Sequence, residues 1–581
     1  MKLFSSFLRG GLLWLLVLAS PTSWAQAPAW QSAIMVGGSN STLVIKATAT
    51  SASGDLFVTG SFSNFVTIGT TQLLSGGGTD GFVAKWSPVT NDFVWAYRLG
   101  GTDIDQVTAV ALNGNRVYIA GTFFSPTASF GNTYLSNAGG FTTVGTDGFV
   151  ARLTDTGASA TFDWAQQLGG TGQDAATALV TTGTSVYVGG HFASPTASFG
   201  SVTLANSNTG STPAFADGFV AKLVDAGTSV STSWVRPITG PASKYVNALA
   251  LNGTNVYATG YFGGLSVSFG GSTLANAGGT ANAYVAKIAD AGPSSTWQWA
   301  LQAGGTGRDV GNAIAVRGAR VYVAGSFSGA TMPLGSLTIA NADAGGTSDA
   351  FVAAVADAGS TASWQWAQQA GGTSNDQATV LTTYGASGVY LAGTFSSAAF
   401  TIGTTPFANS TGNALVASLT DSGLTATANW AQRGGATATN ADAACLALAG
   451  AKLYVAGSFQ STATFGTQTL TSSIAGAANF LASLTDANVT ATASALSGAA
   501  FSLFPNPART STTVTLPALP GNTTAALSLC DALGRSVHTA TVALPVAGLH
   551  HELSLVGLPS GLYALQVRAG TATATRRLVI E

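Results

Sequence analysis

The sequence has 581 residues, of which only 8% are charged, and its formal net charge is −2 at pH 7. This balance provides no basic surface, so we expect no nucleic-acid partner. With 46% hydrophobic residues and 73 glycines, the composition is typical of short strands joined by tight turns.

The first 25 residues have the features of a signal peptide. Lys2 and Arg9 give a positive start, Gly11 to Leu18 form an apolar run, and small residues precede the expected cleavage site after Ala25. A membrane anchor is the alternative, but the run is shorter than the roughly 20 residues that a span needs. We therefore predict a signal peptide over residues 1–25 and no transmembrane span in the mature chain.

From about residue 30 to residue 484 the sequence repeats with a period near 67 residues. Each copy contains a Trp strand, a Gly-rich turn, two apolar strands, a polar loop and a third apolar strand. Seven copies of four short antiparallel strands predict a β-propeller. The tryptophans that mark the copies are Trp30, Trp95, Trp164, Trp234, Trp299, Trp366 and Trp430.

The polar loop of every copy contains an apolar residue followed by glycine. We interpret this residue as a plug beneath the loop. The pairs are Ile68-Gly69, Phe130-Gly131, Phe199-Gly200, Phe269-Gly270, Leu334-Gly335, Ile402-Gly403 and Phe465-Gly466.

The two ends of the repeat region support a closed ring. The chain enters with a Trp strand at Trp30 that has no preceding partners, and the seventh copy ends at Leu484 without a Trp strand. The N-terminal strand can complete the last sheet, which removes exposed strand edges. We therefore predict an all-β fold in which residues 26–484 form a seven-bladed β-propeller closed by the N-terminal strand. An open or differently closed β-repeat is the alternative.

One copy reads Trp164-Ala165, Leu168-Gly169-Gly170-Thr171-Gly172, Asp174, Val186-Tyr187-Val188 and Asp217-Gly218-Phe219-Val220-Ala221-Lys222. This pattern resembles the bacterial seven-bladed β-propeller repeat family, and the resemblance extends over about residues 30 to 484. It implies the propeller fold, an exported location and a binding or adhesive role. It implies no catalytic residues.

After the repeats, residues 485–500 are rich in Ala, Thr and Ser, which predicts a linker. Short apolar segments separated by Pro and Gly turns then predict a small immunoglobulin-like β-sandwich over residues 501–581. Its expected strands are Thr513 to Leu516, Ala526 to Leu529, His551 to Leu555, Tyr563 to Val567 and Arg577 to Ile580.

Four spaced motifs in this region are Phe504-Pro505-Asn506-Pro507, Asp531-Ala532-Leu533-Gly534-Arg535, Leu558-Pro559-Ser560-Gly561-Leu562-Tyr563 and Arg576-Arg577-Leu578-Val579-Ile580. They resemble the C-terminal sorting domain of the type IX secretion system of Bacteroidetes. One departure is the terminal Glu581, where the family usually ends on a basic residue. The resemblance implies export through the periplasm to the surface or the medium, with the secretion machinery as the partner of residues 501–581. An ordinary immunoglobulin-like module is the alternative.

Polar residues recur at two places in the repeats. The first set follows the Trp by ten residues, or by twelve in the last copy, and gives our candidate ligand-face residues: Asn40, Asp105, Asp174, Lys244, Asp309, Asp376 and Asp442. The second set precedes the third strand: Asp80, Asp147, Asp217, Asn282, Asp349, Asn413 and Asn479. A ring of acidic groups could hold a cation or a polar ligand. Recurrence in nearly every copy favours Asx turns, in which the side chain accepts backbone N–H groups.

Residues suited to catalysis are scarce. The repeats contain one histidine, His191, and no glutamate, so a catalytic triad or a His-ligated metal site has little to build from. We interpret His191 as a packed or solvent-facing residue and predict no catalytic residues, metal site or cofactor. Cys445 and Cys530 lie in different modules, which favours free thiols over a disulfide.

Two classes of function remain. The first is a secreted or cell-surface, non-enzymatic binding or adhesion protein whose propeller loop face holds a glycan or a protein. The second is a secreted carbohydrate-active hydrolase or lyase that uses Asp residues on that face. The scarcity of His and Glu favours the first, and the fold alone does not decide between them.

Overall fold

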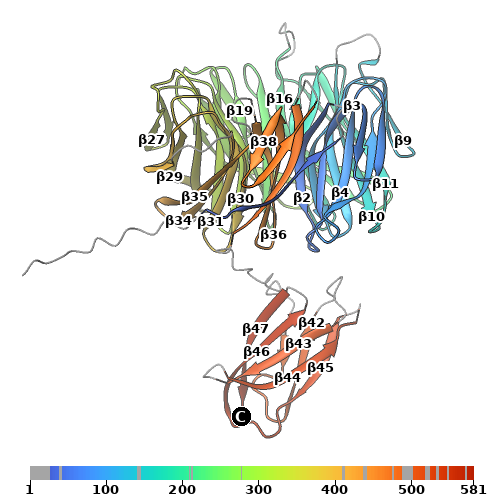
Figure 1. The fold of residues 1–581 in the computed structure, drawn as a ribbon, viewed down its shortest axis with the longest axis vertical. Coiled ribbons are helices and arrows are strands. Elements are labelled where there is room, and N and C mark those ends of the chain that lie inside the picture. Colours follow the sequence, from blue (N-terminus) through green and yellow to red (C-terminus); the bar gives the residue numbers. More distant parts are fainter. Residues whose placement is uncertain are drawn as a thin grey trace, which may run out of the picture. The chain divides into compact units, whose positions relative to one another are not determined.

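The computed structural model describes residues 27–37, 42–140, 145–208, 210, 214–276, 278–407, 413–435, 441–473, 477–486, 502–516, 524–531, 535–545, 548–569 and 572–581. All named elements in these ranges are β-strands, β1 to β47 (Figure 1). The chain divides into two compact units, and the second contains Asp486–Glu581. The predicted signal peptide and nearly all of the predicted linker lie outside the described residues.

The four main strands of each repeat form one antiparallel sheet, as the strand pattern predicts. We number these sheets 1 to 7 in chain order. Sheet 1 contains β2 (Leu43–Thr50), β3 (Leu56–Ile68), β4 (Thr71–Ser87) and β5 (Asp92–Leu99); sheet 2 contains β6 (Asp105–Asn113), β7 (Arg116–Phe123), β10 (Asp147–Asp155) and β11 (Ala160–Gly169); sheet 3 contains β12 (Asp174–Thr182), β13 (Ser185–Phe192), β16 (Asp217–Asp225) and β17 (Val230–Ile238); sheet 4 contains β18 (Lys244–Asn252), β19 (Asn255–Phe262), β22 (Asn282–Asp290) and β23 (Ser295–Ala303). Sheet 5 contains β24 (Asp309–Arg317), β25 (Arg320–Phe327), β28 (Asp349–Asp357) and β29 (Ala362–Gly371); sheet 6 contains β30 (Asp376–Tyr384), β31 (Gly388–Phe395), β34 (Ala414–Asp421) and β35 (Ala426–Gly434); sheet 7 contains β36 (Ala441–Ala449), β37 (Lys452–Gln460), β40 (Ala477–Thr485) and β1 (Trp30–Val36).

The polar loop of the repeat contains a β-hairpin that the sequence analysis did not predict. In sheet 1 the ends of β3 and β4 form it. Elsewhere the hairpins are β8 (Thr127–Phe130) with β9 (Thr133–Ser136), β14 (Thr196–Phe199) with β15 (Val202–Ala205), β20 (Ser266–Phe269) with β21 (Ser272–Ala275), β26 (Thr331–Leu334) with β27 (Leu337–Ala340), β32 (Phe400–Ile402) with β33 (Thr405–Phe407), and β38 (Thr462–Phe465) with β39 (Gln468–Thr471).

The apolar-Gly pairs lie at the turns of these hairpins. The apolar residue of each pair is at most 1% exposed, which confirms the interpretation as a plug. The glycine that follows has a φ near +60°, for example +61° at Gly131 and +66° at Gly200, a conformation that favours glycine. The strands themselves were missed because they are very short and only alternate residues face the core.

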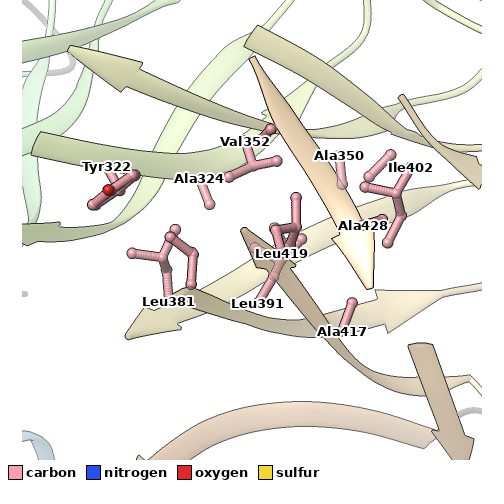
Figure 2. Close-up of a cluster of buried hydrophobic side chains, with 14 of the residues drawn as sticks. Tyr322, Ala324, Ala350, Val352, Leu381, Leu391, Ile402, Ala417, Leu419 and Ala428 are labelled. Carbon is pink, nitrogen blue, oxygen red and sulfur yellow. The ribbon is translucent and has the colours of Figure 1, made fainter. Parts of the chain in front are cut away.

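Hydrophobic side chains fill the space between neighbouring sheets. Figure 2 shows Leu381 and Leu391 of sheet 6 in one buried cluster with Ala324 and Val352 of sheet 5. Both faces of the middle strands are therefore covered, which explains why these strands are almost uninterrupted apolar runs.

Hydrogen bonds between the first strands also join the sheets. A bulge in each of β6, β12, β18 and β24 displaces one polar residue from the strand register. Thr108 of β6 donates to Ala176 O at 2.7 Å, and Asn247 of β18 donates to Gly311 O at 2.9 Å. Thr177, Asn312 and Thr379 donate in the same way to Val246 O, Ala378 O and Ala443 O. These bonds form a series from sheet 2 to sheet 7.

The N-terminal strand belongs to sheet 7. β1 pairs antiparallel with β40, from Trp30 opposite Leu484 to Val36 opposite Asn479. The Asn479 side chain accepts a hydrogen bond from Ile45 N at 3.1 Å and donates one to Leu43 O, both in β2. Sheet 7 therefore contacts sheet 1.

The second unit contains two antiparallel sheets around one hydrophobic core. One consists of β41 (Ser502–Phe504), β42 (Ser511–Leu516) and β45 (Leu549–Ser554), and the other of β44 (Ser536–Ala543), β43 (Thr524–Cys530), β46 (Gly561–Ala569) and β47 (Ala572–Ile580). Val514, Leu527 and Leu565 are among its buried residues. The sequence analysis did not predict β41 and β44. Strand β44 has no fully buried residue, so its sequence shows no apolar pattern.

Candidate functional site

The candidate ligand-face residues lie at the boundaries between sheets. Asp105, Asp174, Lys244, Asp309 and Asp376 begin the first strands of sheets 2 to 6 and are at most 1% exposed. Asp442 in sheet 7 is partly buried, and Asn40 lies outside the described residues. The five buried side chains face other residues of the chain.

Each of these five residues faces a member of the second recurrent set, across the boundary with the preceding sheet. The pairs are Asp80–Asp105, Asp147–Asp174, Asp217–Lys244, Asn282–Asp309 and Asp349–Asp376. In four of them a glycine lies between the two side chains. A methyl group added at Gly169 would lie 2.5 Å from Asp147 Oδ1 and 2.6 Å from Asp174 Oδ2, so only glycine fits there.

Backbone N–H groups surround the carboxylates of the first set. Asp174 Oδ2 accepts from Gly170 N at 2.6 Å, and Oδ1 accepts from Ala193 N at 3.0 Å and from Ser194 N at 3.1 Å. The Ser194 hydroxyl donates to the same carboxylate. Asp105 and Asp376 make equivalent bonds with the turn and with a serine, Ser125 or Ser397. Such contacts fit the structural role of an Asx turn.

Burial shifts the titration of these groups. Burial raises the pKa of Asp147 to about 7, and the neighbouring Asp174 carboxylate adds to the effect. Burial likewise raises the pKa of Asp105, Asp309 and Asp349 to about 6. Each raised value means that placing a negative charge at these boundaries is unfavourable.

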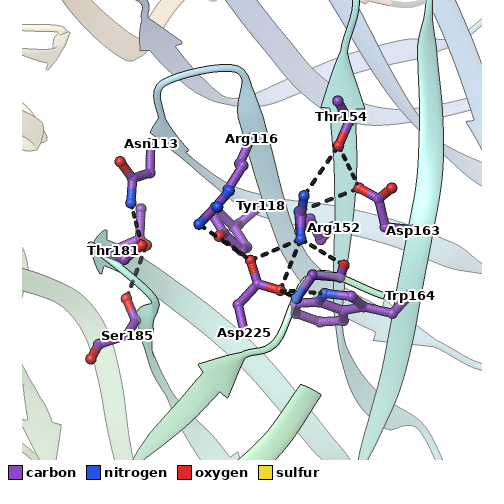
Figure 3. A network of polar contacts seen from close by, with 12 residues as sticks. Asn113, Arg116, Tyr118, Arg152, Thr154, Asp163, Trp164, Thr181, Ser185 and Asp225 are labelled. Carbon is purple, nitrogen blue, oxygen red and sulfur yellow. Dashed lines mark hydrogen bonds and ion pairs between the residues drawn. The ribbon is translucent and has the colours of Figure 1, made fainter. Parts of the chain in front are cut away.

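A third set of aspartates, which the sequence analysis missed, lies at the opposite end of the third strands. Asp225 at the end of β16 accepts from Tyr118 Oη at 2.7 Å, Arg152 Nη1 at 2.9 Å and Trp164 Nε1 at 3.0 Å, all from sheet 2 (Figure 3). The corresponding Trp–Asp bonds are Trp95–Asp155, Trp234–Asp290, Trp299–Asp357 and Trp366–Asp421. We call these five carboxylates the latch aspartates.

A sequence signal could have identified the latch aspartates. Each is followed two residues later by glycine and nine residues later by the repeat Trp, as in Asp225, Gly227 and Trp234. That Trp bonds the latch aspartate of the next sheet rather than its own. The sequence of a single copy therefore does not reveal this Trp–Asp hydrogen bond.

The histidine of the repeats is a packed residue. Its ring lies 4.5 Å from that of Tyr245 in an edge-on contact, and burial lowers the pKa of His191 to about 4. Of the described residues, no group of three or more His, Cys, Asp or Glu side chains is arranged to hold a metal ion. Cys445 and Cys530 are both free, and burial raises the pKa of Cys445 to about 12.

A groove of about 490 Å³ is present beside sheets 3 and 4. Its lining includes Arg236, Ser268, Ser295 and Trp297. Arg236 Nε donates to Ser295 Oγ at 2.9 Å, which fixes the guanidinium. The Trp297 indole N–H is buried and has no hydrogen-bond partner among the residues that the structure describes, whereas Trp364, two residues before the repeat Trp of sheet 5, donates to Gln302 O at 3.2 Å.

Comparison with known proteins identifies the second unit. Residues 502–581 match the secretion system C-terminal sorting domain. This sorting domain directs export by type IX secretion, to the cell surface or the medium, and implies interaction with the secretion machinery. No helix long and apolar enough for a membrane crossing occurs in the part of the chain that the structure describes.

Comparisons of the whole chain find little similarity to known proteins. No curated protein matches the chain. A solved structure of a Synechocystis apocarotenoid oxygenase variant is similar over 74% of this chain and 88% of that chain, with 9% sequence identity and a TM-score of 0.30. At this level of similarity neither the fold nor the activity can be transferred.

Proposed function

We propose that the repeat unit, residues 26–484, is a closed seven-bladed β-propeller. The pairing of β1 with β40 and the bonds of Asn479 to β2 support closure, because they join the last sheet to both the N-terminal strand and the first sheet. The hydrogen-bond series along the first strands supports a regular succession of blades. Residues 1–25 are then a signal peptide and residues 485–500 a linker to the sorting domain.

The function that we propose is glycan binding outside the cell without catalysis. The groove beside sheets 3 and 4 is the observation that carries it. It combines an aromatic ring, a fixed guanidinium and hydroxyl groups, which is a combination of apolar surface and polar groups that suits a sugar ring. The buried aspartate pairs do not serve as substrate contacts in this proposal, since backbone groups and neighbouring side chains surround them.

A glycan array probed with the full chain tests this function. We expect a defined glycan to bind, and we expect Trp297→Ala to weaken that binding at least tenfold. Trp364→Ala is the matched control, because Trp364 occupies the same place in the next sheet but does not line the groove. Equal binding by both variants, or no glycan bound at all, would contradict the proposal. Release of cleaved sugar from the bound glycan would contradict its non-enzymatic part.

A further inference from the structure

We infer that a cluster of three aromatic side chains and one arginine, shared by sheets 3 to 5, is a second binding site and takes the carboxylate of an acidic sugar. The cluster consists of His191, Tyr245, Tyr261 and Arg308, and we call it the Arg308 cluster. None of its members lines the groove beside sheets 3 and 4.

All four residues lie at the end of the sheets where the first strands begin. Tyr245 is the second residue of β18, and Arg308 directly precedes β24. His191 and Tyr261 are the next-to-last residues of β13 and β19. Because the second strand of each sheet runs antiparallel to the first, it ends where the first begins. The fold therefore brings residues of three sheets together at one end.

The side chains of the cluster fix one another. Tyr245 and Tyr261 are cross-strand partners, and their rings stack at 4.7 Å between centroids with an angle of 21°. His191 meets the Tyr245 ring edge-on at 4.5 Å. The guanidinium carbon of Arg308 lies 4.9 Å from the centre of the Tyr261 ring, which is a cation–π contact. The rings therefore form a support for the guanidinium.

The other repeats carry different residues at these positions. At the position of Tyr245 they have Val44, Gln106, Ala175, Val310, Gln377 and Asp442. At the position that Tyr261 and His191 share they have Ser61, Thr122, Ser326, Thr394 and Ser458. At the position of Arg308 they have Thr42, Ile104, Gln173, Ser243, Asn375 and Asn440. The repeat fold does not require the cluster, since the other sheets form without it.

The backbone of Arg308 is held in place, whereas its side chain is exposed. Arg308 N donates to Ser328 Oγ at 2.8 Å, and Ser328 Oγ donates to Arg308 O at 3.3 Å. An isolated β-bridge joins the same residue to Ala281 of sheet 4. The adjacent Asp309 is buried and accepts from Gly305 N at 2.8 Å. The guanidinium is exposed and forms no ion pair with any residue that the structure describes.

Two other arginines on the last strands of their sheets bond to groups of the chain itself. Arg98 Nε donates to Asp80 Oδ2 at 2.7 Å. Arg433 Nη2 donates to Phe395 O at 3.0 Å and to Ser397 O at 2.9 Å. Arg308 differs from both, because its guanidinium stacks on a ring. Stacking leaves the N–H groups in the guanidinium plane available, and a carboxylate can accept two of them in parallel.

The tyrosines beside the guanidinium favour a sugar as the carrier of the carboxylate. Tyrosine combines an apolar ring with a hydroxyl group, which suits the C–H and O–H groups of a sugar. A sugar that also carries a carboxylate is a uronic acid. The assignment to a sugar rests on the glycan-binding function proposed above, whereas the assignment to a carboxylate rests on Arg308.

Isothermal titration calorimetry of the full chain with trigalacturonic acid, at pH 7 and low salt, tests the inference. We expect binding that weakens as salt is added, because the contact is between charges. Arg308→Ala should weaken it by about tenfold or more, and Arg308→Lys, which keeps the charge but not the fork of donors, should have an intermediate effect. Lys46→Ala is the matched control, because Lys46 is another exposed cation of the repeats but lies in sheet 1.

Four outcomes would count against the inference. It would be overturned by the absence of trigalacturonic acid binding, by equal binding of the original chain and Arg308→Ala, or by equal losses in Arg308→Ala and Lys46→Ala. Tighter binding of triglutamate than of the trisaccharide would overturn the assignment to a sugar. Arg308→Ala should melt like the original chain, since the side chain is exposed. Failure of the groove proposal is distinguishable, because Trp297→Ala tests the groove and Arg308→Ala tests this cluster.

Discussion

Buried aspartates lie at both ends of the same strand in this protein, each bonded across a boundary between sheets. At the start of β16, Asp217 forms a buried ion pair with Lys244 of sheet 4 and also accepts from Ser207. At its end, Asp225 is surrounded by donors. Burial alone would raise the pKa of Asp225, but hydrogen bonds from Tyr118, Trp164 and Arg152, among others, outweigh burial and hold the pKa below its ordinary value.

The latch aspartates should therefore contribute to stability in a pH-dependent way. Asp225→Asn removes the charge that Arg152 faces, and we expect a loss of about 3 kcal/mol in the free energy of unfolding at pH 7. Because the pKa in the folded state is below the unfolded value, this contribution is present above about pH 4 and is lost as the pH falls below it.

Urea denaturation of the original chain and of Asp225→Asn between pH 3 and pH 8 measures this difference. The difference in the free energy of unfolding between the two proteins should be constant from pH 5 to pH 8 and should become smaller below pH 4. Asp92→Asn serves as the control, since Asp92 is exposed and its carboxylate accepts from the adjacent Phe93 N. A difference in unfolding free energy that is small at pH 7, or that grows in acid, would show that Asp225 does not stabilise the fold through its charge.

At the scale of elements, the sequence predicts the sheets better than their connections. Strands such as β13 contain five consecutive buried residues, so a run of apolar residues and glycines in the sequence reveals them. The hairpins and β44 escape prediction because few of their residues are buried. The aspartate pairs and latches escape for another reason. Each joins residues of two copies, so no single copy contains the information.

The N-terminal strand gives the clearest prediction at this scale. Removal of residues 27–37 should leave β40 with an unpaired edge and expose the site of Trp30, whose indole donates to Arg433 O at 2.9 Å and whose ring contacts Phe465. We expect a lower melting temperature and concentration-dependent aggregation.

A synthetic peptide of residues 27–37 should add a strand to β40 and so restore the melting temperature of the truncated chain and prevent its aggregation. A peptide of the same composition in scrambled order should do neither. Differential scanning calorimetry and light scattering report the two effects. If the truncated chain melts like the original and remains monomeric without peptide, the proposed closure of the ring is wrong.

At the scale of the whole molecule, the hydrophobic core of the repeats and the domain that directs export lie in different units. The hydrophobic clusters between the repeat sheets are built from residues of the repeats, and the core of residues 502–581 is a separate cluster. Residues 502–581 carry the sorting domain, whereas the repeats carry the groove. Loss of the second unit should therefore change where the protein goes and leave the folding of the first unit intact.

Truncation after residue 500, in a host with a type IX secretion system, tests this division. We expect the original chain at the cell surface or in the medium and the truncated chain in the periplasm, as measured by fractionation and immunoblotting. The retained protein should resist limited proteolysis as well as the exported one does, because its sheets bury their apolar faces against one another. A truncated chain that is retained but rapidly degraded would show that the repeats need the second unit for folding. Equal export of both chains would show that residues 502–581 are not required for sorting in this protein.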